Sequence, residues 1–466
     1  MHCGYITQLK NVREHPNADK LALAECFGNT VCVAKDSSYE NQVVIYFPVD
    51  LQLSVEYCEQ NNLVRKKDEN GNNIGGYLDP EKRNIRAIKL RGEKSDGLTM
   101  PLSSLAYTGI DVSTLKIGDI ITTVNGHEIC QKYIPKTNVR GDHSRNGNKT
   151  RKHKHPIAPL FMEHADTEQL AYNLSAFKPG DEVEITLKMH GTSQRTAHLP
   201  VLIGYKRTFW DKIFKRPGTP IYDWGDVSGT RRVVLDNYDG GFYGSNEFRE
   251  QHSKTFEDKL WKGETIYYEV VGFTHTGAPI MAEVVNSKVS DKTFAKEYGP
   301  TTVFSYGCVP NGTKTWYGAD ETGVFSIDLK HPQSDIYVYR MTMTNEDGQV
   351  VEYTPDFMRY RCEQMGVKTV PVLWKGTIPM NPASADDPTI SAGDWIKLVA
   401  ERFYDGPDPI GKTHVREGVV VRILNRPKFC AYKHKNHTFK VISGIIAESV
   451  ADGEVDIQDA DILAEL

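Results

Sequence analysis

A strongly basic stretch that is poor in apolar residues divides this chain of 466 residues into two unequal parts. The stretch runs from Lys132 to His155, and Asp142 is its only acidic residue. Because it has too few apolar side chains to form a core, we expect it to lie between folded units rather than inside one. A chain of this length also exceeds what a single core usually supports. The predicted organisation is an N-terminal domain (residues 1–130), a basic linker (131–158), a C-terminal domain (159–449) and an acidic tail (450–466).

Two roles fit this linker equally well. It is either a solvated tether or a strap that contacts phosphates, because clustered lysines and arginines release counterions when they meet a nucleic-acid backbone. The net charge of −5 argues against a protein that simply coats nucleic acid, but it is compatible with a local basic track. The basic residues of the stretch are Lys132, Lys136, Arg140, Arg145, Lys149, Arg151, Lys152 and Lys154.

The composition is that of an ordinary globular protein, with 39% hydrophobic and 25% charged residues. No run approaches the ~20 apolar residues that a membrane-spanning helix needs, and the N-terminus has no pattern of a secretory signal. None of the eight cysteines belongs to a Cys-x-x-Cys pair, so neither a zinc ribbon nor a redox motif is indicated. We expect Cys26 and Cys32 to be buried thiols in a cytoplasmic protein, and we expect a monomer.

The two parts of the chain differ in their pattern of secondary structure. Short β-branched and aromatic runs, separated by Gly, Asn and Asp turns, predict about five strands that would form a small barrel in the N-terminal part. The C-terminal part mixes strands with helices, which predicts an α+β domain with a largely antiparallel sheet. There we expect strands at residues 182–187, 265–272, 302–306, 336–342, 418–423 and 429–432, and helices at residues 161–177, 355–365 and 392–403.

Lys188 is the first candidate for chemistry. It follows the strand predicted at residues 182–187 and precedes Met-His-Gly-Thr-Ser, so its side chain can enter a cleft from a strand end. A lysine must lose its proton to act as a nucleophile, and only ~1 in 2,500 is neutral at pH 7. Burial, neighbouring cations and a metal lower that cost. Attack on the α-phosphorus of ATP would form a lysyl-AMP; the alternative is a surface lysine beside a turn.

Two carboxylates and two lysines follow in apolar strands. Glu269 lies in Ile-Tyr-Tyr-Glu-Val-Val-Gly, where a buried charge needs a partner; holding a ribose hydroxyl and an internal hydrogen bond are the two alternatives. Glu417 precedes Gly-Val-Val-Val and is suited to hold a divalent metal near phosphates. Lys433 and Lys435 alternate onto one face of a strand. That face either binds an anionic phosphate and favours a neutral Lys188 nearby, or is a solvated strand face.

The order of these elements resembles motifs I, III, IV and V of the covalent nucleotidyltransferase superfamily, which contains DNA ligases, RNA ligases and mRNA capping enzymes. The motifs are Lys-x-His-Gly, a strand glutamate, Glu-Gly-Val-Val-Val and Lys-x-Lys, and they extend from Lys188 to Lys435, more than half of the chain. The resemblance implies a nucleotidyltransferase domain with ATP-grasp-like antiparallel sheets, in which Lys188 takes the AMP.

Two features are similar to RNA ligases within this superfamily. His190 stands where DNA ligases and capping enzymes usually have aspartate, and the roughly thirty residues after Lys435 are too few for the OB domain that follows in those enzymes. An OB-fold module at the N-terminus instead resembles the Deinococcus type of RNA ligase, and His-Pro-Asn-Ala-Asp-Lys-Leu at residues 15–21 resembles the opening of tRNA-binding OB domains. This resemblance implies ATP and Mg²⁺ or Mn²⁺ as cofactors and RNA, including nicked RNA/DNA duplexes, as the partner.

The resemblance also implies roles for single residues. Arg231 in Ser-Gly-Thr-Arg-Arg resembles motif Ia, with Arg232 in reserve, and Tyr339 rather than Tyr337 resembles the aromatic residue of motif IIIa that stacks on adenine. Leu187 departs from the polar residue that some RNA ligases use to read adenine, so backbone groups would have to read the base. The implied nucleotide-binding residues are Lys188, Gly191, Arg231, Glu269, Tyr339, Lys433 and Lys435. The implied catalytic residues are Lys188, His190, Glu417, Lys433 and Lys435, with Glu417 as the metal ligand.

The function that follows is an ATP-dependent RNA ligase that seals 3′-OH and 5′-phosphate ends in RNA repair. A DNA ligase or a capping guanylyltransferase is the alternative among enzymes. A non-catalytic RNA- or tRNA-binding protein is the alternative among binding proteins, based on the N-terminal module and the basic linker. Long intervals between the motifs also predict insertions around residues 203–225 and 287–330.

Overall fold

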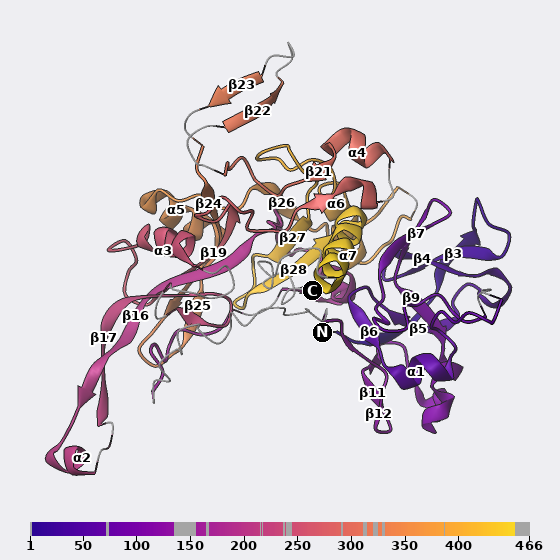
Figure 1. The fold of residues 1–466 in the computed structure, drawn as a ribbon, viewed down its shortest axis with the longest axis horizontal. Helices are drawn as coiled ribbons and strands as arrows, with labels where there is room; N and C mark the ends of the chain where they lie inside the picture. The colour runs from indigo at the N-terminus through magenta and orange to yellow at the C-terminus, as the bar shows by residue number, and fades with distance from the viewer. Residues whose placement is uncertain are drawn as a thin grey trace.

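The computed structural model describes residues 2–70, 74–134, 155–164, 167–214, 216, 218–235, 238, 245–289, 292–310, 315–319, 325–328, 331–385 and 387–452. Most of the predicted basic linker and residues 453–466 of the predicted tail lie outside these ranges. Figure 1 shows the N-terminal strands gathered on one side of the molecule and the later strands and helices on the other. None of the described helices is long and apolar enough to cross a membrane.

The N-terminal part is rich in β-strands, as predicted, and divides them among several small sheets. Only Leu9 separates β1 from β2, so one segment passes from a four-stranded sheet, β10-β1-β5-β9, into a three-stranded sheet, β2-β3-β4. No continuous ladder closes these sheets into a ring among the described residues, and the small barrel remains a prediction. The bounds are β1 (Gly4–Gln8), β2 (Lys10–Glu14), β3 (Leu21–Cys26), β4 (Asn29–Ala34), β5 (Val43–Phe47), β6 (Leu51–Leu53), α1 (Val55–Gln60), β7 (Ala87–Leu90), β8 (Glu93–Asp96), β9 (Leu98–Pro101), β10 (Ile120–Ile121), β11 (Thr123–Val124), β12 (His127–Glu128) and β13 (Cys130–Lys132).

Strand β5 lies between the two hydrophobic clusters of the N-terminal part, so both of its faces are buried. Ile45 and Phe47 pack in one hydrophobic cluster, whereas Val44 and Tyr46 pack in another. Successive side chains of a strand point to opposite faces, so a strand that is apolar at every position is predicted to be covered on both sides.

The C-terminal part contains two main sheets, and their strands are antiparallel except for β14, which runs parallel to β28. The larger sheet has the order β18-β17-β16-β19-β24-β25 and the smaller has the order β14-β28-β27-β15-β26. The predicted antiparallel α+β arrangement is therefore confirmed for this part. The bounds are β14 (Glu168–Gln169), β15 (Glu182–Leu187), β16 (Thr192–Lys206), α2 (Phe209–Ile213), β17 (Thr219–Gly229), β18 (Val234–Leu235), α3 (Glu247–Lys254), β19 (Glu264–Gly272), β20 (Val284–Val285), α4 (Lys292–Tyr298), β21 (Thr301–Thr302), β22 (Thr315–Ala319), β23 (Phe325–Asp328), β24 (Ser334–Thr344), β25 (Val350–Glu352), α5 (Pro355–Met365), β26 (Val372–Thr377), α6 (Ala392–Glu401), β27 (Gly418–Ile423), β28 (Cys430–Lys435) and α7 (His437–Asp452).

The helix predicted at residues 161–177 is wrong. The described residues of this segment form the short strand β14 and two single 3₁₀ turns, at Leu170–Tyr172 and Leu174–Ala176. Leu170 and Phe177 imitate the spacing of a helical face, but both reach the core of the smaller sheet from these turns. Strand β14 pairs with β28 instead, and this tertiary contact outweighs the local helical preference.

The strand predicted at residues 302–306 is shorter than expected. Only Thr301–Thr302 forms a strand, β21, and the chain then becomes irregular. Tyr306 has a positive φ of 48°, a backbone conformation that residues other than glycine rarely adopt. This turn places Phe304 and Tyr306 against His190 rather than along a sheet.

Both intervals predicted to hold insertions contribute to a projecting hairpin (Figure 1). The interval around 203–225 forms most of a long hairpin of β16 and β17, with α2 at its tip (Figure 1). The interval around 287–330 contains α4, β21 and the small β22–β23 hairpin, which projects at the opposite edge of the view.

The N-terminal and C-terminal parts meet at α7. Asp96, at the end of β8, is buried and binds both His437 and Lys440 of this helix, with 2.9 Å between the Asp96 and Lys440 side chains. Burial alone would raise the pKa of Asp96, but the Lys440 charge and the His437 hydrogen bond outweigh it and hold that pKa well below its usual range. The helix that follows the predicted Lys-x-Lys element is therefore a docking surface for the N-terminal part.

Candidate active site

Lys188 lies at the end of β15, beside the first residue of β27. Its backbone N–H donates a hydrogen bond to the Gly418 carbonyl, with 3.0 Å between nitrogen and oxygen. Its Nζ lies 2.9 Å from Oε2 of Glu417, whose carboxylate is buried. Pairing of β15 with β27 thus brings together a lysine and a glutamate that are more than 200 positions apart in the sequence.

Glu417 is held between two lysines. Lys435, opposite Gly418 in the β27–β28 ladder, places its Nζ 3.1 Å from Oε1 of the same carboxylate. Burial alone would raise the pKa of Glu417, but Lys188 and Lys435 outweigh this effect and lower it to about 2. The carboxylate is therefore ionised at neutral pH, and it partly neutralises two cations that would otherwise repel each other.

Gly418 is required by the close approach of β28. A Cβ at this position would lie 2.1 Å from the carbonyl oxygen of His434, and its φ of +149° is also unfavourable for other residues. Gly191, which follows His190, is similarly constrained, because a Cβ there would lie 2.4 Å from the Val270 carbonyl oxygen. The described geometry thus gives Gly191 a packing role against β19.

His190 is a buried, neutral residue in an aromatic surround. Its ring lies edge-on to Phe304 and Phe439, with centroid distances of 4.6 Å and 4.7 Å. Burial lowers its pKa to about 3, although the Glu417 carboxylate, 3.8 Å from Nδ1, acts in the opposite direction. Its backbone N–H donates to the hydroxyl of Tyr306 over 2.7 Å. His190 therefore orders the turn after Lys188 and does not carry a positive charge at neutral pH.

A pocket beside Lys188 lies between the two main sheets. Lys188, Arg231, Glu269 and Tyr339, all predicted from the sequence, line it together. Its free volume is about 100 Å³, smaller than the roughly 300–1,000 Å³ typical of ligand sites, so side chains must move to admit a nucleotide. Arg232 is exposed and does not line this pocket.

The two candidate tyrosines separate clearly in the structure. Tyr339 lines the pocket and shares a hydrogen bond with the Ser193 hydroxyl, 3.0 Å away. Tyr337 is buried in the core next to it. A register shift in the β19–β24 ladder lies nearby, between Tyr267 and Tyr268, so strand alternation alone could not have separated the two.

Lys433 does not line the pocket, and it lies opposite Val420 in the β27–β28 ladder. The positive charges of Lys435 and Lys433 interact with the carboxylate of Asp50 in the N-terminal part. Burial raises the pKa of Asp50, and the two lysine charges offset only part of that increase. The two lysines of β28 therefore interact with Glu417, through Lys435, and with Asp50 of the N-terminal part.

Three charged residues at the pocket were not predicted from the sequence. Arg359 of α5 forms a two-pronged ion pair with Glu184 of β15, with N–O distances of 3.1 Å and 2.8 Å. Arg422 of β27 lies opposite Glu184 in the ladder and stacks its guanidinium over Phe429, 5.1 Å from the ring centroid. The signal that singled out Glu269, a charge inside an apolar strand, also applies to Glu184 and Arg422 and could have found them.

The charges around the pocket suit an anionic ligand. Three arginines, from α5, from β27 and from the loop after β17, and Lys188 face it, while one of its two glutamates is engaged by Arg359. No group of three or more His, Cys, Asp or Glu side chains that could hold a metal is found among the described residues. A divalent ion here would need ligands beyond such a cluster, such as oxygens of a phosphate ligand and of water.

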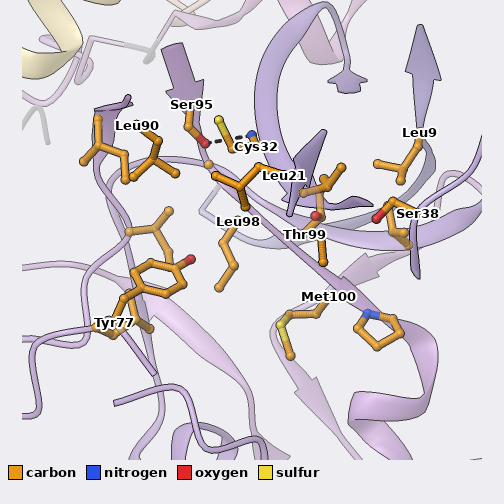
Figure 2. A pocket seen from close by; sticks show the side chains of 18 of the residues that line it. Leu9, Leu21, Cys32, Ser38, Tyr77, Leu90, Ser95, Leu98, Thr99 and Met100 are labelled. Carbon is orange, nitrogen blue, oxygen red and sulfur yellow. Dashed lines mark hydrogen bonds between the residues drawn. The ribbon is translucent and has the colours of Figure 1, made fainter. Parts of the chain in front are cut away.

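A larger cavity, of about 850 Å³, lies in the N-terminal part (Figure 2). Its lining is mostly apolar, with Leu9, Leu21, Leu98 and Met100 among the side chains that face it. It contains none of the predicted site residues, so the cavity with the larger volume is not the one lined by the reactive and charged side chains. Because a group transfer needs a nucleophile and charged groups, the smaller pocket at Lys188 is the candidate active site.

Comparison with solved structures gives matches to Naegleria gruberi RNA ligase, whereas no protein-family model and no curated protein matches the sequence. The ligase with PPi aligns with a TM-score of 0.52 at 14% identity, covering 94% of this chain and 98% of that chain. A mutant with ATP and Mn aligns with a TM-score of 0.53 at 15% identity and the same coverage. A mutant with AMP and Mn aligns with a TM-score of 0.51 at 15% identity, covering 94% and 97%. This chain has the fold of these RNA ligase structures. The likeness covers nearly all of both chains, so it includes the N-terminal part as well as the two main sheets.

Proposed function

We propose that this chain is an ATP-dependent RNA ligase in which Lys188 forms the covalent bond to AMP. The observation that carries the proposal is the buried Glu417, held between Lys188 and Lys435 next to a pocket rich in arginine. Partial burial and neighbouring cations activate a lysine nucleophile, and Lys188 is partly buried close to Lys435 and beside the pocket arginines. The likeness to RNA ligase structures that contain ATP, AMP or Mn supports the same conclusion.

In the first step, Nζ of Lys188 attacks the α-phosphorus of ATP. A nitrogen–phosphorus bond forms, the bond from that phosphorus to the pyrophosphate oxygen breaks, and the lysine proton passes to water, to which the Lys188 side chain is partly exposed. Glu417, with a pKa of about 2, is a weak proton acceptor. The charge on Lys435 therefore supplies part of the bias toward a neutral Lys188, because a neighbouring cation disfavours a second positive charge. A bound Mg²⁺ or Mn²⁺ would add to this bias and neutralise phosphate charge, with Glu417 as its protein ligand.

The pocket walls hold the nucleotide in this proposal. Glu269 accepts hydrogen bonds from the ribose, Tyr339 stacks on the base, and Arg231 contacts the sugar or the nucleic-acid end. The additional cations, Arg359 and Arg422, favour the negative charge of the phosphates. Leu187 is buried at the pocket and presents no polar atom from its side chain, so the base is read by other groups.

The later steps join two nucleic-acid ends. A 5′-phosphate attacks the lysyl-AMP and releases Lys188, which gives an adenylylated 5′ end. A 3′-OH then attacks that end and expels AMP. The Deinococcus type of RNA ligase, with an N-terminal OB module and sealing of nicks in duplex RNA or RNA/DNA during repair, is the specific form that we propose. In this proposal the N-terminal part, which contacts α7 through Asp96, also contacts the nucleic acid.

Labelling with α-³²P-ATP, followed by a denaturing gel, tests the first step. The wild-type protein is expected to retain the label with Mg²⁺ or Mn²⁺, and Lys188→Ala is expected to lose it completely because no other amine replaces Nζ. Lys368→Ala, which removes an exposed lysine paired with Asp335, is the matched control and should label as the wild type does. Label that persists in Lys188→Ala would place the nucleophile elsewhere.

The same assay separates the alternatives. Label from α-³²P-GTP alone would indicate a capping guanylyltransferase, and no label with either nucleotide under any metal would leave a non-catalytic RNA-binding protein. Sealing of nicked duplexes with RNA or DNA on each side of the nick then distinguishes an RNA ligase from a DNA ligase. We expect sealing only where RNA supplies the 3′-OH end.

A further inference from the structure

The hairpin of β16 and β17 carries large apolar side chains at its far end. Phe209, Trp210, Ile213 and Phe214 are 52–72% exposed, and they belong to none of the hydrophobic clusters formed by the described residues. Figure 1 shows α2 at the end of the hairpin, projecting from the body of the molecule. A group of exposed apolar side chains in one place usually marks a surface that binds something.

The aromatic side chains are held in a defined arrangement. A capping box between Thr208 and Asp211 fixes the start of α2. The rings of Trp210 and Phe214 stack at a centroid distance of 5.9 Å and an interplanar angle of 18°. The guanidinium of Arg216 lies over the Phe214 ring, 5.5 Å from its centroid. Rings that are already ordered lose little conformational entropy when a partner stacks on them.

The tip is also basic in a chain that is acidic overall. Residues 206–216 contain five basic residues and one acidic residue, whereas the whole chain has a net charge of −5. The acidic residue, Asp211, is engaged in the helix cap, and the exposed residues Lys206, Arg207 and Arg216 flank the rings. Aromatic faces beside cations are the combination that binds unpaired bases and their phosphates.

The hairpin is continuous with the sheet that forms the active-site pocket. Strand β16 begins at Thr192, four residues after Lys188, and Ser193 pairs directly with Glu269. Thirteen residues separate Ser193 from Lys206, which at ~3.3 Å per residue places the tip about 40 Å from the pocket. That span is similar to the ~34–36 Å of one turn of a nucleic-acid duplex.

We propose that the tip of the β16–β17 hairpin binds unpaired bases of the nucleic-acid substrate, about 40 Å from Lys188. Bases of a single-stranded segment stack on Trp210 and Phe209, and Lys206, Arg207 and Arg216 bind the adjoining phosphates. This role rests on the proposed function, because it assumes that the ligand is the polynucleotide whose end enters the pocket. A second contact on the same molecule raises the local concentration of that end at Lys188.

Binding of fluorescently labelled RNA, measured by anisotropy without ATP, tests this role. The triple variant Phe209→Ala, Trp210→Ala, Phe214→Ala should bind a single strand of ~20 nucleotides at least about tenfold more weakly than the wild type, because stacking on each lost ring contributes to affinity. Binding of a blunt RNA duplex of the same length should change less than about threefold, because its bases already stack on one another. Tyr39→Ala removes an equally exposed ring from the N-terminal part and should leave both affinities unchanged.

The contribution of the basic residues at the tip is tested separately, by the salt dependence of RNA binding. The variant Lys206→Gln, Arg207→Gln, Arg216→Gln should flatten the dependence of single-strand affinity on salt, by roughly 0.7 units of the log–log slope for each phosphate contact removed. Circular dichroism checks that both hairpin variants keep the wild-type fold.

Four outcomes decide the proposal. Unchanged single-strand binding in the triple variant would overturn it, as would equal losses for strand and duplex. Loss of binding to phosphatidylserine vesicles with RNA affinity intact would identify a membrane surface instead, and loss of a dimer in sedimentation would identify a contact between copies of this chain. Labelling of Lys188 by α-³²P-ATP is measured in parallel. Absence of that label, with the RNA effect intact, would contradict the ligase function while still supporting binding by the hairpin.

Discussion

At the scale of single residues, the candidate active site is organised around one buried carboxylate. Glu417 is fully enclosed, yet it stays ionised because Lys188 and Lys435 lie on its two oxygens. A lone buried carboxylate would instead protonate. The two lysines in turn tolerate burial because they share this anion, so the three residues form one unit.

Glu417→Gln is expected to weaken both folding and nucleotide transfer. The folded pKa of about 2 lies below the ordinary value of 4.5, so the charge stabilises the fold above pH 4.5, and this contribution is lost as the pH falls toward 2. The shift corresponds to a contribution on the order of 3 kcal/mol at neutral pH. Urea unfolding should therefore show a wild-type advantage at pH 7 that shrinks on acidification. Labelling of Lys188 should fall at least about 100-fold, because Glu417 is the proposed protein ligand of the metal ion that neutralises phosphate charge.

Glu14→Gln provides the control for this prediction. It removes one carboxylate from an exposed ion pair with Lys35, which contributes little to stability. A variant at Glu417 that keeps the wild-type pH dependence of unfolding would show that its carboxylate is not stabilised by the lysines.

At the scale of elements, strand ladders position the site. Pairing of β15 with β27 sets Lys188 against Gly418, and pairing of β27 with β28 sets Lys435 there as well. Strands β19 and β24 of the other sheet supply Glu269 and Tyr339 from the far wall. The turn through Phe304 and Tyr306 closes the space around His190.

Gly418→Ala is expected to disturb this ladder. The added methyl group would meet the His434 carbonyl at 2.1 Å, so β27 and β28 must separate, at a cost of about 2–3 kcal/mol. Lys435 and Glu417 would shift with the strands, and labelling of Lys188 should decrease together with the free energy of unfolding. Both are measurable on one preparation, by urea titration and by the nucleotide assay.

Gly366→Ala is the matched substitution. Gly366 ends α5 with a φ of +71° and open space around it, so the cost should be only about 1 kcal/mol, with normal labelling. Equal effects of the two substitutions on labelling would contradict a specific role for the Gly418 contact.

At the scale of the whole molecule, α7 connects the N-terminal part with the two main sheets of the C-terminal part. Asp96 contributes a buried carboxylate from one side, and His437 and Lys440 contribute partners from the other. Phe439 of the same helix packs on His190, so one helix touches both the docking contact and the candidate site. A change at this interface can therefore reach the pocket through two adjacent positions of α7.

Asp96→Asn is expected to loosen this docking. Breaking one side of a buried ion pair costs roughly 3–5 kcal/mol, because Lys440 keeps its charge without its partner. The folded pKa of Asp96 is depressed, so its contribution is present above the ordinary value of 3.8 and is lost as the pH falls below it. Hydrogen exchange at pH 7 should become faster in α7 and in β7–β8. The exposed substitution Asp19→Asn should leave exchange there unchanged, and unaltered exchange in Asp96→Asn would show that other contacts hold the two parts together.

The local sequence pattern by itself determined the bounds of the strands next to Lys188 and Glu417. β15, β27 and α5 have the predicted bounds, because their apolar periodicity agrees with their burial and their ends are marked by charge or by a capping residue. The order of the lysine and glutamate motifs predicted that Lys188, Glu269 and Glu417 would matter, and the described structure places all three near one another.

Only the tertiary structure decided which further residues surround the pocket and how the parts dock. Arg359, Glu184 and Arg422 come from three elements, and their meeting depends on ladder register and helix placement, which local sequence does not encode. Pairing with β28 likewise overruled the helical spacing of Leu170 and Phe177. The physical reason is the same in each case: periodicity reports which face of an element is apolar, whereas long-range contacts decide what that face meets.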